Sequence, residues 1–274
     1  MCRLIVSMVL ALLCTTSLAA AQDRDENWRV CANKDRAPPD VPIRACTAII
    51  ESKQEKDSDL ASAYYNRAIA RDEKKMHDQA IADYSEAIRL DPSDARHFYN
   101  RGNSYSAKRD YAHAIADYGE AIRLKPDDAN AWVSRANQYQ RQGQFDKALA
   151  DYTEALKVDP QHVNALGSRC WSNVRLDRLQ AALADCDAAL KLRPDHADAL
   201  DSRGFVNLRL GRLDAAIADY DAALKLDAKL ATSLYGRGVA RQRKGDAAGG
   251  GADIAAATKI NAAIAREMAR YGLK

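Results

Sequence analysis

The side chains that could carry out chemistry do not form a recognisable catalytic or metal-binding motif. The five histidines are scattered, and His162 and His196 stand 34 residues apart only because the sequence repeats with that period. The strings G-x-S-x-G, H-E-x-x-H and G-x-x-x-x-G-K, which mark hydrolases, zinc proteases and phosphate-binding loops, do not occur. The sequence therefore predicts a protein that is not an enzyme and that uses no cofactor or metal.

The elements that would position any site come from one 34-residue pattern that occurs six times without insertion. Its clearest string is IADY at 81–84, 115–118 and 217–220, with LADY at 149–152 and LADC at 183–186. Each unit contains two stretches with the apolar spacing of an amphipathic helix. A fixed period of this length predicts stacked supersecondary units. The units span residues 61–94, 95–128, 129–162, 163–196, 197–230 and 231–264.

Particular positions of the unit keep the same kind of residue. The fourth is aromatic or Leu, the eighth is small, and the twentieth is Ala in five units. The twenty-seventh is Ala in all six, the twenty-fourth is mostly Tyr, and the thirty-second is often Pro. Small residues let two helix axes approach closely. This pattern resembles the tetratricopeptide repeat family over about residues 61–264. The resemblance implies an all-α, right-handed α-solenoid of about six helix-turn-helix repeats that serves as a binding surface.

Residues 1–21 have the features of a secretory signal peptide. Arg3 precedes the short apolar run 4–13, and Ala19, Ala20 and Ala21 supply an A-x-A cleavage site. The run is too short to span a membrane. We therefore expect a secreted protein, most naturally periplasmic, with no membrane span. Because the net charge is only +3 over 274 residues, no basic footprint for nucleic acid is expected either.

The segments on either side of the repeats complete the predicted organisation. Residues 22–58 are expected to form an N-terminal disulfide-linked helical segment, ahead of the repeat region 59–264. Residues 265–274 are expected to form a helix that covers the open apolar face of the last repeat, with docking to a partner as the alternative. Gly249, Gly250 and Gly251 weaken the last repeat, since each Gly costs roughly 1 kcal/mol relative to Ala in a helix.

Four cysteines follow the predicted signal peptide, and an even number in an exported chain favours disulfides. Cys170 and Cys186 occupy the eighth and twenty-fourth positions of one unit, which face each other across the helix pair. Residues 43–52 align with 81–90 and place Cys46 at the same twenty-fourth position, fifteen residues after Cys31. We predict the pairs Cys31–Cys46 and Cys170–Cys186; free buried thiols are the alternative.

Arginine and aspartate form a second strict pattern. Every unit has Arg at its seventh position and Asp at its twenty-third. A ligand site would vary along the chain, whereas a packing device repeats, so we expect ion pairs between neighbouring helices rather than ligand anchors. The arginines are Arg67, Arg101, Arg135, Arg169, Arg203 and Arg237, and the aspartates are Asp83, Asp117, Asp151, Asp185, Asp219 and Asp253.

The binding site should lie where the units differ. In this family the first helices line the concave face, so the second, fifth, ninth, twelfth and thirteenth positions are candidates. In the later units an Arg row lies beside large apolar residues, a combination typical of binding hot spots; a solvated basic edge is the alternative. The candidates there are Trp171, Phe205, Val239, Arg141, Arg175, Arg209 and Arg243. The candidates of the earlier units are Asn103, Asn137, Tyr65 and Tyr99.

We therefore predict an exported scaffold or adaptor that binds a protein or peptide in its concave groove. The Arg row would favour a partner with acidic groups. The fifth position has no Lys, which argues against binding of chaperone tails. Two alternatives remain: a structural component of an envelope complex, and a binder of small acidic cell-wall ligands.

Overall fold

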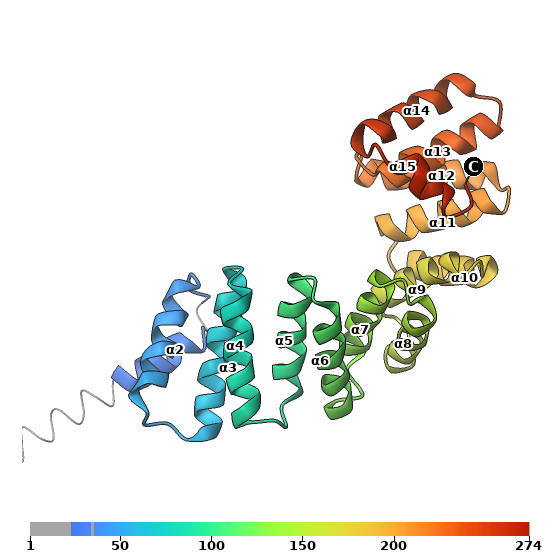
Figure 1. Ribbon diagram of the computed structural model, residues 1–274. Coiled ribbons are helices and arrows are strands. Elements are labelled where there is room, and N and C mark those ends of the chain that lie inside the picture. Colours follow the sequence, from blue (N-terminus) through green and yellow to red (C-terminus); the bar gives the residue numbers. More distant parts are fainter. Residues whose placement is uncertain (1–22, 34–35, 274) are drawn as a thin grey trace, which may run out of the picture. The chain divides into compact units, whose positions relative to one another are not determined.

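All regular structure in the described part of the chain is helical (Figure 1). The computed structural model describes residues 23–33 and 36–273, so the predicted signal peptide at 1–21 lies outside the described residues. Within those ranges, no helix combines the length and the apolar character that a membrane crossing requires.

The helices form two compact units, residues 1–126 and 127–274. In the first unit, a helix at residues 23–31 precedes five helices that pack in chain order, each against the next. These are α2 (Asp40–Ser52), α3 (Asp57–Glu73), α4 (His77–Leu90), α5 (Ala95–Ala107) and α6 (Tyr111–Leu124).

The second unit continues the same alternation of first and second helices and ends in a shorter one. Each long helix packs against the next one in the chain, and α15 packs against α13 and α14. The helices are α7 (Ala129–Arg141), α8 (Phe145–Val158), α9 (Val163–Arg175), α10 (Leu179–Leu192), α11 (Ala197–Arg209), α12 (Leu213–Leu226), α13 (Ala231–Arg243), α14 (Ala247–Ile260) and α15 (Ile264–Ala269).

The turn inside each repeat uses the left-handed backbone region at one fixed position, the fifteenth. Gly143, Gly211 and Gly245 have φ values of 75°, 74° and 97° there, a region in which glycine carries no steric cost. Lys75 and Arg109 occupy the same position in the first two repeats, with φ values of 61° and 63°. The turn geometry therefore belongs to the repeat and does not require glycine.

Packing inside a repeat depends on a tyrosine ring that lies on a residue without a large side chain. A Cβ atom added to Gly102 would lie 2.9 Å from Cε1 of Tyr118, and one added to Gly204 would lie 2.9 Å from Cε1 of Tyr220. Such distances are too short for any real Cβ. The eighth and twenty-fourth positions thus hold the two helices together, with the ring almost completely buried.

The predicted Arg–Asp pairs are confirmed in every repeat. The guanidinium of the seventh position contacts the carboxylate of the twenty-third at 2.5–2.8 Å, and all six aspartates are buried. Several of these arginines also reach back to the twenty-fifth position of the preceding repeat. Arg237, for example, pairs with Asp221 at 2.7 Å as well as with Asp253. Each such arginine therefore ties three helices together.

We predict strong non-additivity in the Arg135–Asp151 pair. Asp151→Ala leaves a half-buried guanidinium without its carboxylate and should lower the free energy of unfolding by about 2–3 kcal/mol. The double variant Arg135→Met/Asp151→Ala should cost clearly less than the two single changes together. Urea unfolding followed by circular dichroism measures all three. Additive losses would contradict a structural ion pair at this place.

Both cysteine pairs are bonded in the structure, in the arrangement that the repeat pattern indicates. Cys31 joins Cys46 and so fixes the helix at residues 23–31 on α2. Cys170 joins Cys186 across α9 and α10. The second bond stands where other repeats place a small residue and a tyrosine, so a covalent bond replaces the ring contact.

Peptide mapping should recover these two pairs from the protein isolated under oxidising conditions. Digestion without reductant is expected to yield one linked peptide pair containing Cys31 and Cys46, and another containing Cys170 and Cys186. Each closes a loop of about 15 residues and should stabilise the fold by roughly 3 kcal/mol in the chain-entropy model. Free thiols or cross-pairing between the two sets would contradict this arrangement.

The second unit ends in a compact apolar cluster beneath α15. Ile264, Met268 and Leu273 are each at most 2% exposed and pack with residues of α11 and α13. The backbone carbonyl of Tyr271 accepts a 2.7 Å hydrogen bond from Nη1 of Arg209, which fixes the chain after α15 against α11. The last segment is therefore part of the hydrophobic core of this unit.

Candidate functional site

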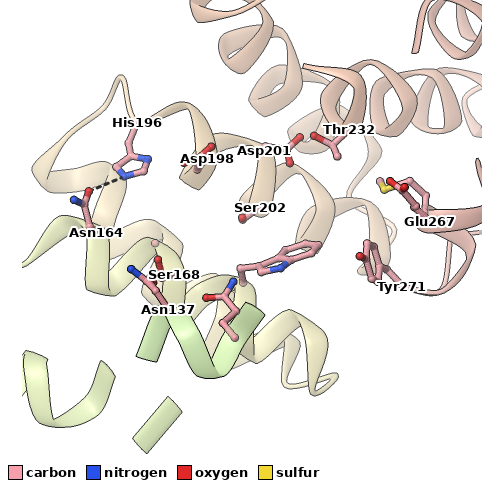
Figure 2. Close-up of a pocket in the computed structure, with 14 residues that line it drawn as sticks. Asn137, Asn164, Ser168, His196, Asp198, Asp201, Ser202, Thr232, Glu267 and Tyr271 are labelled. Atoms are coloured by element: carbon pink, nitrogen blue, oxygen red, sulfur yellow. Dashed lines mark hydrogen bonds between the residues drawn. The ribbon is translucent and has the colours of Figure 1, made fainter. Parts of the chain in front are cut away.

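The residues at the variable positions of the first helices surround a cavity in the second unit. Its volume is about 580 Å³, which lies within the usual range for ligand sites. The lining comes from α7, α9, α11, α13 and the segment of α15 that closes one side (Figure 2). The stacking of successive first helices brings these residues together, because each contributes its own second, fifth, sixth, ninth or twelfth position.

One side of the cavity carries carboxylates. Asp198, Asp201 and Glu267 line it, and no lysine or arginine does. Asp201 accepts a hydrogen bond from the Ser233 hydroxyl, and Figure 2 shows Asp201 beside Thr232. Burial raises the pKa of Asp201 to about 6, against the opposing effect of these hydroxyls. The cavity is thus an acidic site, and the pKa of one of its carboxyl groups lies about one unit below neutral pH.

His196 forms another part of the wall in a defined tautomer. It begins α11 as the N-cap, and its Nδ1 accepts a hydrogen bond from the backbone N–H of Ala199 at 3.3 Å. Its Nε2 lies 3.4 Å from Oδ1 of Asn164, as the dashed line in Figure 2 shows. Because Nδ1 accepts, the proton lies on Nε2, and burial lowers the pKa of the ring. His196 therefore caps α11 through Nδ1 and directs its Nε2–H toward Asn164.

Polar side chains and one large ring complete the lining. The hydroxyl of Tyr152 lies 2.6 Å from Oδ1 of Asn137 and 2.7 Å from Oε1 of Gln140, so the two amide oxygens share its single proton. Trp171 contacts Tyr271 edge to face, with ring centroids 5.3 Å apart. The wall therefore offers amide donors and acceptors beside an aromatic surface.

A smaller hollow of about 330 Å³ adjoins the cavity and carries the opposite charge. The two share Asn137 and Trp171 among their lining residues, and the hollow adds Arg141 and Arg175. The Arg175 guanidinium lies between two rings, 4.3 Å from the centroid of Phe145 and 4.4 Å from that of Tyr271. We call the cavity and the hollow together the groove.

Two of the predicted contact residues do not face any groove. Phe205 is 1% exposed and Val239 is 8% exposed, so the expectation that they present an open binding surface is wrong. The physical reason is the last segment of the chain. Ile264, Met268 and Leu273 pack into the same cluster as these two side chains and cover the apolar face.

Only part of the predicted Arg row lines the groove. Arg209 is committed to the carbonyl of Tyr271 and to Asp177, at 2.7 Å each. Arg243 is exposed and lines neither the cavity nor the hollow. Only Arg141 and Arg175 of the row therefore belong to the groove.

The predicted residues of the first repeats belong to the other unit and support its packing. The Tyr65 hydroxyl accepts a hydrogen bond from Nδ2 of Asn100 at 2.8 Å. Asn103 accepts one from the Tyr118 hydroxyl at 2.7 Å, and the Tyr99 ring packs on that of Tyr118. These contacts give the side chains a structural role.

The acidic side of the cavity was not among the predicted site residues. Asp201 carries a signal in the sequence, because it stands at the fifth position, where three other repeats have Tyr. Glu267 carries none, since its place in the wall depends on how the chain folds back after the last repeat. Ser168 and Asn164 likewise become site residues only through the stacking of α9 on α11.

Replacement of Asp201 by Asn should stabilise the protein in a pH-dependent way. A carboxyl whose pKa is raised from 3.8 to about 6 by folding stabilises fully only below pH 3.8, and this contribution is lost as the pH rises through 6. Asp201→Asn should therefore raise the free energy of unfolding at pH 7.5, by at most about 3 kcal/mol. The gain should vanish near pH 4.

Urea unfolding at both pH values measures this difference. Asp127→Asn, which removes a carboxylate from an exposed position, controls for the change in net charge. An equal effect of Asp201→Asn at pH 7.5 and pH 4 would contradict a destabilising buried carboxylate.

Comparison with known proteins supports the repeat architecture. A tetratricopeptide repeat model matches residues 61–94, 95–128 and 129–162, the same boundaries as the first three predicted units. A related repeat model matches residues 208–245. No curated protein matches the chain.

Solved structures share the fold at low sequence identity. A tetratricopeptide repeat protein from Parabacteroides merdae is 14% identical, with a TM-score of 0.68, over 92% of this chain and 99% of that one. PilF of Pseudomonas aeruginosa is 13% identical, with a TM-score of 0.66, over 78% and 98%. YrrB, described as a repeat protein with an unusual peptide-binding site, is 22% identical, with a TM-score of 0.55, over 68% and 97%.

Proposed function

The chain belongs to the tetratricopeptide repeat family, and from this premise we propose that it is an exported adaptor that binds an extended segment of a partner protein in the groove. The repeats form an interaction scaffold, and the groove is where their variable positions meet. The observation that carries the proposal is the lining itself. It combines fixed side-chain amides, an aromatic ring and both signs of charge within one continuous surface.

The lining suits a peptide better than a compact small molecule. Asn137, Gln140 and Asn164 can each donate to and accept from an extended backbone. Their carbonyl groups are already fixed by hydrogen bonds from neighbouring side chains. A groove that is ordered before the ligand arrives loses little entropy on binding. The structural likeness to YrrB, which has a peptide-binding site of its own, points the same way.

Export is supported by the disulfides. Bonds such as Cys31–Cys46 and Cys170–Cys186 persist in oxidising compartments and are rare in the reducing cytosol. The sequence of residues 1–21 agrees with this proposal, and together they support an exported protein that works in the periplasm. The partner would then be a protein of the cell envelope or of the exported fraction.

One further observation favours assembly as a second candidate function. Four large apolar side chains at the thirtieth position of successive repeats are 41–49% exposed, which forms a periodic row outside the groove. Such a row could join the chain to a larger complex. A size that rises with protein concentration, measured by sedimentation, would favour this function over the adaptor. The residues are Val158, Leu192, Leu226 and Ile260.

Affinity capture from an envelope extract tests the adaptor function. The wild-type protein should retain a partner that the variant Trp171→Ala/Arg175→Glu retains at least about tenfold less, because both side chains line the groove. Arg243→Glu is the matched control, since it makes the same charge change at the same repeat position but lies outside the groove. It should capture the partner as the wild type does.

Equal capture by the groove variant and the wild type would contradict the proposal. Far-ultraviolet circular dichroism and thermal melting must first show that each variant is folded. The comparison then reports on the groove alone.

A further inference from the structure

The cavity is lined in part by the fourth repeat, which lacks both large residues of an otherwise recurring pair. In the first two repeats the fifth and twenty-fourth positions are tyrosines whose rings pack together. The ring centroids of Tyr65 and Tyr84 are 5.9 Å apart, and those of Tyr99 and Tyr118 are 5.6 Å apart. The third, fifth and sixth repeats keep at least one large member. In the fourth repeat the two positions are Gly167 and the disulfide-bonded Cys186.

The glycine at the fifth position of the fourth repeat leaves room for part of the cavity. In the third repeat the hydroxyl of the twenty-fourth residue, Tyr152, reaches the ninth and twelfth positions of its own repeat. In the fourth repeat the ninth position is Trp171, which lines the cavity together with Gly167. A Cβ on Gly167 would make ordinary contacts, at 3.7 Å with the ring of His196 and at 4.0 Å with Cβ of Ala199. The ring that Tyr65 and Tyr99 supply at the fifth position is therefore absent here, and the space beside Gly167 belongs to the cavity.

The open space has the chemistry of a receptor for a cation. Three carboxylates line it, the aromatic ring of Trp171 is part of the same lining, and no lysine or arginine of the described residues lines it. Aromatic faces and carboxylates together attract guanidinium and ammonium groups. Next to Asp201, the Tyr220 hydroxyl is completely buried and has no hydrogen-bond partner among the described residues. The charge of Asp201, after burial, raises the pKa of that hydroxyl.

We propose that the cavity binds a basic side chain, arginine or lysine, of the partner segment. This inference rests on the proposed function, because it names the part of the ligand that enters the groove. The neighbouring hollow with Arg141 and Arg175 then receives an acidic group of the same segment. The groove thus selects a segment that carries both charges, rather than a purely acidic one.

Binding to degenerate peptide libraries tests this selectivity. Each library has one fixed central residue, Arg, Lys, Glu or Leu, with mixed residues around it, and is passed over the immobilised full-length protein. Arg- and Lys-centred peptides should be retained at least fivefold better than Glu- or Leu-centred ones. The Asp201→Asn/Glu267→Gln variant should lose this preference, whereas Asp127→Asn, at an exposed position outside the groove, should keep it.

A second pair of variants tests the origin of the cavity. Gly167→Tyr restores the ring found at the fifth position of three other repeats and should fill the space, with at least a tenfold loss in retention of Arg-centred peptides. Gly167→Ala adds only a methyl group at ordinary contact distance and should bind as the wild type does. Equal retention by these two variants would overturn the assignment of the cavity.

The outcomes separate the two proposals. Retention of peptides without a preference for basic residues, or with a preference for Glu, overturns this inference and leaves the adaptor function standing. Retention of no library at all by the wild-type protein overturns binding of extended peptides in the groove, and this inference with it.

Discussion

The contact between a tyrosine ring and a small residue is the constraint on which the rest of the structure depends. In most repeats the twenty-fourth residue places its ring on the eighth, and the approach is so close that Gly102 and Gly204 could not carry a Cβ without displacing the ring. Because the buried ring fills the interior between the two helices, these repeats are closely packed there. Replacement of the ring by a disulfide at Cys186 keeps the helices joined but fills less space. The fourth repeat is therefore held by a covalent bond where four others have the ring, and its fifth position, Gly167, lines the cavity.

The Arg–Asp pairs add a second constraint, because they fix the position of each repeat against the preceding one. Arg203 contacts Asp219 of its own repeat and Asp187 of the preceding one, at 2.6 and 2.8 Å. A charge buried between three helices is costly unless its partners are in place. These contacts thus favour one arrangement of neighbouring helices. The groove requires such precision, since its lining comes from at least four of them.

Much of this fold could be predicted from the sequence, because its determinants recur every 34 residues. The helix pairs, the Arg–Asp contacts and the cysteine pairing all follow from position within the repeat, as Arg135 and Cys170 illustrate. The buried state of Phe205 and Val239 could not be predicted in this way. It depends on Met268 and Leu273, which occur once and fold back on the repeats. The same segment supplies Glu267, so one of the three carboxylates of the cavity comes from a part of the chain that does not repeat.

The groove differs from that of a general adaptor in one respect, because its proposed specificity arises where the repeat pattern is interrupted. A crystal structure of the protein bound to an arginine-containing peptide tests this most directly. The account predicts the guanidinium in the cavity, within hydrogen-bond distance of the Asp201 carboxylate and against the Trp171 ring. A bound peptide whose basic side chains all remain outside the cavity, with no ligand atom in contact with Gly167, would contradict this expectation.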